Sequence, residues 1–171
     1  MPLPIYEVFT NPKLLNEHPS EEELLLNPMT GQIPGNVMWV SKDDRPRRYV
    51  SKEFIEGATY KCEHHYEYAL DVACWGRDWN YELEEFIGFV RSECDSYTPD
   101  SPFFELRHPD YSMTTFGPLA SAKLVADFKA WDERARRFSD MEFYIGYLMV
   151  WACFERAANN NDAARCFYRF S

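Results

Sequence analysis

Glycine and long apolar runs are both scarce in this sequence. Only seven of the 171 residues are glycine, whereas 46% are hydrophobic and 17% aromatic, a composition typical of a folded protein and not of a disordered one. The longest uncharged apolar run, Phe143 to Phe154, is shorter than the ~18 residues that a membrane span requires. The N-terminus lacks the basic and apolar regions of a signal peptide. We therefore expect a cytoplasmic protein without a membrane segment.

The familiar signatures of enzymes are also missing. The sequence contains no G-x-S-x-G elbow, no phosphate-binding loop, no dinucleotide-binding glycine motif and no H-E-x-x-H pair, which excludes the enzyme classes that these motifs mark. The five cysteines are odd in number, and no two of them have C-x-x-C spacing, so reduced thiols are the simplest interpretation. The sequence gives no reason to expect a cofactor.

Positive charge is in short supply as well. The chain has 18 basic and 28 acidic residues, a net charge of −10. Residues 61–116 alone contain four basic and twelve acidic residues, a net charge of −8. A nucleic-acid-binding protein needs a basic stripe to neutralise phosphates, and none is present. The acidity serves either solubility alone or binding to a basic protein partner.

The hydrophobic patterns predict an α+β fold, with a small and mostly antiparallel sheet packed by about four helices. Residues 1–35, which contain six prolines, are predicted to form an extended arm with a short helix that Ser20 and Glu23 begin as a capping box. Residues 36–171 are predicted to form a single domain. The predicted helices cover about residues 21–26, 81–94, 118–137 and 140–158, and the predicted strands cover 37–40, 48–55, 103–108 and 164–170.

The stretch "YKCEHHYEYALDVACWG" (Tyr60 to Gly76) fits both a strand and a helix. Fourteen residues without a breaker exceed the usual length of about 3–10 residues for a strand, so we expect a helix. In that helix Glu63, Glu67 and Asp71 recur every four residues and form an acidic solvent face.

This stretch also suggests a metal site or a nucleophile. On a helix, metal ligands need to be three or four residues apart, and only Cys62 and His65 satisfy that spacing, so we expect no metal. A nucleophilic pair made of Cys62 or Cys74 with His64 or His65 remains an alternative, because such pairs form in space and not along the sequence.

Two tryptophans, Trp75 and Trp79, flank a short segment that ends in Asp78. Each indole either covers a helix end within the core or anchors a protein interface, where tryptophan is enriched.

The C-terminal half resembles an uncharacterised family of short proteins from bacteria and their phages. The resemblance rests on "PFFEL" (Pro102 to Leu106), "GPLASAKLVADF" (Gly117 to Phe128), "WACFERAA" (Trp151 to Ala158) and the final aromatic strand. The chain departs from the family pattern in ending Phe170-Ser171 instead of Phe-His, and in having "NNND" where the family has a Gly-rich turn. The resemblance implies helix packing and a phage or mobile-element setting, and it supplies no catalytic residue. Small acidic proteins in that setting are often inhibitors or immunity proteins, some of which mimic nucleic acid.

The leading functional expectation is a non-enzymatic protein that inhibits or neutralises a basic protein partner, such as a nucleic-acid-binding protein, through an acidic surface. The expected partner-binding residues are Glu63, Glu67, Asp71, Trp75, Asp78, Trp79, Glu82, Glu84 and Glu85. The alternatives are a thiol- or histidine-dependent enzyme on an unfamiliar scaffold and an oligomeric structural component. No cofactor, metal, membrane or direct nucleic-acid contact is expected.

Overall fold

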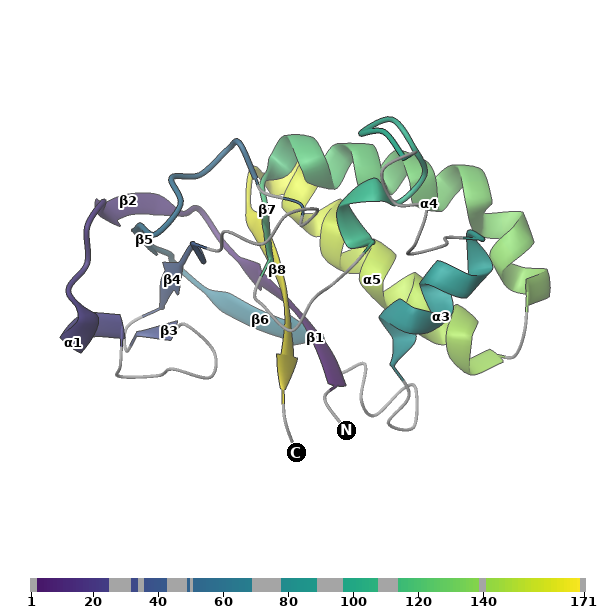
Figure 1. Ribbon diagram of the computed structural model, residues 1–171, viewed down its shortest axis with the longest axis horizontal. Coiled ribbons are helices and arrows are strands. Elements are labelled where there is room, and N and C mark those ends of the chain that lie inside the picture. The colour runs from purple at the N-terminus through teal and green to yellow at the C-terminus, as the bar shows by residue number, and fades with distance from the viewer. Residues whose placement is uncertain are drawn as a thin grey trace.

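The computed structural model describes residues 3–24, 32–33, 36–42, 49, 51–68, 78–88, 97–107, 114–138 and 141–169. It confirms the α+β class in a single domain, but the strands form two antiparallel sheets instead of one (Figure 1). The two sheets lie side by side, and the long helices pack against the sheet that contains both ends of the described chain.

The central sheet contains four strands in the order β6-β1-β8-β7. Their bounds are β1 Leu3–Phe9, β6 His65–Tyr68, β7 Thr114–Phe116 and β8 Ala163–Arg169. The first and the last strand of the described chain are therefore the two inner strands, and they pair over their whole length in antiparallel register. Both strands contribute buried side chains to the core, among them Ile5 on β1 and Phe167 on β8.

The second sheet is smaller and has the order β2-β5-β4-β3. Its strands are β2 Lys13–Asn16, β3 Gln32–Ile33, β4 Val37–Trp39 and β5 Thr59–Lys61. The chain passes from β1 into β2 and returns from β5 into β6, so one pair of strands bends from one sheet into the other. At the bend the Thr10 amide donates to His64, and the Glu63 amide donates to Thr10. Asn11 has a left-handed φ of 46° at this point, which is where the strand changes direction.

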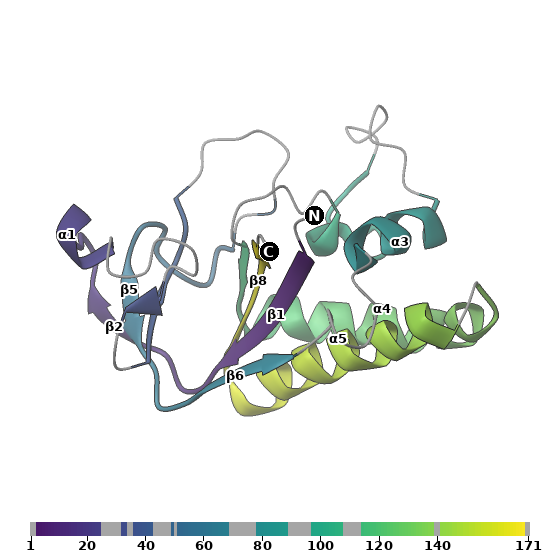
Figure 2. The same ribbon diagram turned by 90° about the horizontal axis from the view of Figure 1, so that it is seen from below.

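Two long helices, α4 Pro118–Phe138 and α5 Met141–Asn160, run back along each other and cover one face of the central sheet (Figure 2). Their bounds agree closely with the predicted helices. Buried aromatic side chains from both helices and the sheet fill the space between them, among them Tyr6, Phe116, Phe128, Tyr147 and Phe154. None of the helices in the described part of the chain has the length and apolar character that a membrane crossing requires.

The shorter helices begin at side-chain caps. Helix α1, Glu21–Leu24, starts as predicted, with the Glu23 amide donating to Ser20 Oγ over 3.3 Å. Helix α3, Trp79–Phe86, begins two residues before the predicted start because Asp78 accepts a hydrogen bond from the Tyr81 amide. The later part of the predicted helix 81–94, beyond Gly88, lies outside the described residues.

The helix predicted over Tyr60 to Gly76 is wrong for its first half. Residues 59–61 and 65–68 form the strands β5 and β6, and residues 69–77 lie outside the described chain. The length argument failed because the bend between the two sheets divides the stretch into two short strands. Neither short strand exceeds the usual strand length.

The extended N-terminal arm is also wrong for its first residues, because β1 lies at the centre of the sheet. Pro4 misled the prediction, since proline lacks an amide donor. Pro4 nevertheless lies within β1, opposite Tyr168 of β8. The predicted strand 103–108 is wrong, because Phe104–Leu106 form a 3-10 turn. The predicted strand 48–55 is wrong over residues 51–55, which do not form a β-strand.

A carboxylate caps the longest helix from a distant part of the chain. Glu53 accepts hydrogen bonds from the amides of Leu119 and Ala120, at 2.7 and 3.2 Å, in the first turn of α4. Amides at a helix start lack partners within the helix, and a negative charge there is stabilising. Gly117 makes room for this contact, because a Cβ at that position would meet the Glu53 side chain and lie 2.6 Å from its Cβ.

We predict that Gly117→Ala lowers the free energy of unfolding by about 1–2 kcal/mol, the cost of losing a helix cap, because the added methyl group displaces Glu53. Urea denaturation followed by circular dichroism measures this change. If the effect acts through the cap, Glu53→Ala/Gly117→Ala will be no less stable than Glu53→Ala alone. Additive losses in the double variant would contradict this explanation.

Candidate functional site

The most deeply buried charges are Glu7 on β1 and Arg165 on β8. The two residues are directly opposite each other across the strands, and both are buried. Arg165 Nε and Nη2 both lie 2.8 Å from Glu7 Oε2, and the guanidinium also contacts the rings of Phe9 and Phe167. Burial lowers the pKa of Arg165, and the Glu7 carboxylate opposes that shift.

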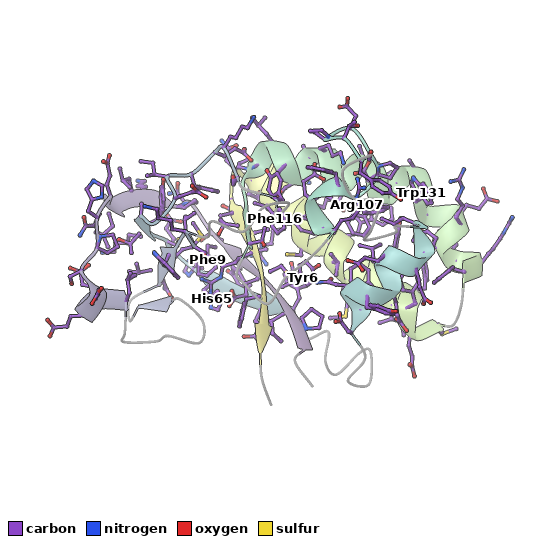
Figure 3. All side chains as sticks on the ribbon, viewed as in Figure 1. Tyr6, Phe9, His65, Arg107, Phe116 and Trp131 are labelled. Carbon is purple, nitrogen blue, oxygen red and sulfur yellow. The ribbon has the colours of Figure 1, made fainter. Side chains whose placement is uncertain are left out.

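His65 completes this charged cluster from the neighbouring strand β6. Its Nε2 lies 2.7 Å from the second carboxylate oxygen of Glu7, and its ring stacks on Phe9 at 4.7 Å between centroids (Figure 3). The His65 side chain is 22% exposed, whereas Glu7 is 1% exposed. A carboxylate beside an imidazole is an arrangement that orients histidine for proton transfer, but here the carboxylate also neutralises Arg165.

The cluster belongs to a polar row that crosses the face of the central sheet turned away from the helices. Tyr6 and Val8 pack toward the helices, so Glu7 between them points to the opposite face. In register across the four strands lie Glu67, Glu7, Arg165 and Thr115. Sequence reasoning missed this row. The signal was available, since Glu7 is the single charge of β1 and Arg165 is an opposite charge within the mostly apolar first part of β8.

The thiols do not support a nucleophile among the described residues. Burial raises the pKa of Cys62 and of Cys166 to about 12 and raises that of Cys153 well above its ordinary value. A thiolate is the reactive form of cysteine, so these three side chains stay protonated and inert near neutral pH. His65 bonds to Glu7 and not to Cys62, and Cys74 lies outside the described residues.

The predicted acidic stripe does not exist as a helical face. Glu63 lies at the bend between the sheets, where its Oε1 accepts a hydrogen bond from Asn11 Nδ2 at 2.9 Å, and Glu67 lies on β6. Both are exposed. Asp71 and Trp75 lie outside the described residues. The stripe was derived from a helical period that this stretch of chain does not have.

Most of the predicted binding residues on helix α3 and at its start are buried or make contacts within the fold. Trp79 has no exposed surface, stacks on Phe143 and donates from Nε1 to the Phe143 carbonyl at 3.1 Å. It is therefore a core residue, and its prediction as an interface anchor is corrected. Glu84 is only 4% exposed, Asp78 caps the helix, and Glu82 is half-buried. Of this group only Glu85 is exposed.

A different set of carboxylates is open to solvent on the segment from Glu17 to Leu24, which we call the acidic arm. Its four acidic residues are all exposed, they make no ion pair with another described residue, and α1 buries no side chain. They are Glu17, Glu21, Glu22 and Glu23. The arm lies at the end of the molecule opposite the last turn of α4 (Figure 1).

A cavity of about 480 Å³ lies beside the bend between the sheets, at the end of β2 and β5. It is lined by Asn11, Lys13, Leu14, Leu15, Asn36, Lys61, Cys62 and Glu63. The volume is within the range of about 300–1,000 Å³ typical of small-molecule sites. Its lining combines two lysines with two exposed leucines, so it offers both a charged and an apolar wall.

Within the described ranges no three His, Cys, Asp or Glu side chains are placed so that they could bind a metal ion. Comparison with known proteins adds no assignment. No protein-family model, no curated protein and no solved structure matches the chain.

We predict that Glu7→Gln lowers the free energy of unfolding by about 3–5 kcal/mol, since it leaves Arg165 buried without an anion. Urea denaturation measures the loss. The matched control is Glu67→Gln, which removes an exposed carboxylate directly opposite Glu7 and should cost less than about 0.5 kcal/mol. Equal losses in the two variants would show that the buried pair contributes nothing special.

We also predict that Cys62, Cys153 and Cys166 resist iodoacetamide in the native protein at mildly alkaline pH, because burial raises their pKa values and denies access to the reagent. Peptide mass spectrometry measures modification at each cysteine, and the urea-unfolded protein serves as the positive control. Rapid native modification of Cys62 would restore the thiol-enzyme alternative.

Proposed function

We propose that this protein is a non-enzymatic binding protein that occupies a basic surface on a protein partner. The observation that carries the proposal is the acidic arm, where four exposed carboxylates lack ion-pair partners among the described residues. A cluster of this kind attracts a basic surface and accelerates its association. The net charge of −10 acts in the same direction over longer distances.

Three cations of α4 are already paired with carboxylates of the helical half. Lys123 contacts Glu105 and Asp127 at 3.0 and 2.8 Å. Further along α4, Arg136 pairs with Asp132 and Arg137 with Glu133, one helical turn away. The acidic arm lies at the other end of the molecule, where a basic partner would be the natural source of counter-charge.

The resemblance of the C-terminal half to short bacterial and phage proteins adds a biological setting to this proposal. In that setting the protein would act in the cytoplasm as an inhibitor or immunity protein, and its partner would be a nucleic-acid-binding protein whose basic groove it covers. The thiol-dependent alternative is less well supported, because burial suppresses the reactivity of the three described cysteines.

We predict that Glu22→Lys/Glu23→Lys slows association with the partner by about tenfold or more, because it reverses the charge that steers the encounter. The partner is first isolated by affinity capture from a bacterial lysate and purified, and its association rate is then measured at low and high ionic strength. Binding should weaken as salt screens the exposed charges.

The matched comparison is Glu82→Lys/Glu85→Lys, which changes the net charge equally but lies on α3. The arm proposal requires the α1 variant to be the slower of the two. Equal effects would mean that only net charge matters, a larger effect on α3 would place the contact there, and salt-independent binding would exclude electrostatic recognition altogether.

A further inference from the structure

Two lysines face each other across the sheet without any anion between them. Lys13 on β2 and Lys61 on β5 are directly opposite in antiparallel register, and both are exposed. Neither ammonium group makes a hydrogen bond or ion pair with another described residue. Like charges at opposed positions destabilise a sheet, so this pairing has a cost that needs a compensating interaction.

The acidic residue in the same cavity does not provide that interaction. Glu63 Oε1 accepts a hydrogen bond from Asn11 Nδ2 at 2.9 Å, and the Glu63 carbonyl accepts one from Asn36 Nδ2 at 3.1 Å. Glu63 is thus bound by the two asparagines that shape the bend. Among the described residues that line the cavity, the two lysines are the only cations.

The remaining wall of the cavity is apolar. Leu14 is 47% exposed and Leu15 is 55% exposed, on an outer strand of the smaller sheet. A register shift falls between Leu14 and Asn16, and such an irregularity redirects a side chain from the regular alternation. Apolar side chains in a concave site beside a few charged groups are typical of small-molecule sites.

We propose that this cavity binds a small organic anion, with its carboxylate or phosphate between Lys13 and Lys61 and its apolar part against Leu14 and Leu15. The anion would remove the repulsion between the opposed lysines and satisfy both ammonium groups through charge-assisted hydrogen bonds. The site is separate from the acidic arm in chemistry, because it recognises negative charge. It does not depend on the protein partner proposed above.

The test is a titration of the ¹⁵N-labelled protein with four probe molecules, in which the amide chemical shifts report binding. The probes separate the contribution of the negative charge from that of the apolar chain. Octanoate and octyl phosphate carry both chemical features, inorganic phosphate carries the charge alone, and octylamine carries the same chain with the opposite charge. We expect octanoate or octyl phosphate to shift the amides of Lys13, Leu14, Asn36 and Lys61, inorganic phosphate to bind more weakly at the same residues, and octylamine not to bind there.

Two double variants are compared. Lys13→Gln/Lys61→Gln removes two positive charges from the cavity, and Lys52→Gln/Lys129→Gln removes two from exposed positions outside it. The first should weaken binding of the organic anions by about tenfold or more, the loss expected for charge-assisted contacts, and the second should leave it nearly unchanged. Without ligand, the first variant should also be at least as thermally stable as the original protein, because the repulsion is gone.

Three results would overturn the proposal. They are equal weakening by the two double variants, octylamine binding as tightly as octanoate at these residues, and shifts confined to other parts of the protein. Binding of inorganic phosphate as tight as that of octyl phosphate would overturn the role of Leu14 and Leu15 and leave a site for the charge alone. Because no protein partner is present in this experiment, its outcome is independent of the proposed function.

Discussion

The buried pair of Glu7 and Arg165 is the interaction on which the arrangement of the central sheet depends. Each residue lies on one of the two inner strands, and together they align the beginning of the described chain with its end. A shift of the register by one residue would place the two charges on opposite faces of the sheet, with one of them toward the aromatic core under the helices. Buried ion pairs add little net stability but penalise every arrangement that separates them, so this pair favours one register over its alternatives.

Ion pairing also distinguishes the charges in the rest of the molecule from one another. Several charges of α4 are paired with nearby residues, as in the contacts of Lys123 with Glu105 and Asp127, and these pairs stabilise the fold. The carboxylates of the acidic arm and the lysines of the cavity are not paired in this way. The two proposed interactions therefore arise where the fold leaves charge uncompensated, one site for a basic partner and the other for a small anion.

Sequence patterns predicted an element correctly where its structure depends on residues that are close to it in the sequence. The long helices could be predicted because their apolar residues recur with a helical period over five turns, and Ser20 marked the start of α1 through a contact three residues away. The stretch from Tyr60 to Gly76 could not be predicted, because two periods fitted it equally well. The deciding fact was the pairing of its residues with β1 and β2, which are about fifty residues away in the sequence.

The sequence by itself determined the α+β class, the two long helices, the strands at residues 37–39 and 163–169, and the excess of negative charge, since each depends on composition or on short-range periodicity. Only the tertiary structure decided that β1 is central, that Trp79 is a core residue, and that Glu7 meets Arg165 and His65. It also decided which charges remain available for binding. Each of these outcomes depends on contacts between segments that are distant in the sequence. Hydrophobic periodicity and the spacing of motifs contain no information about such contacts.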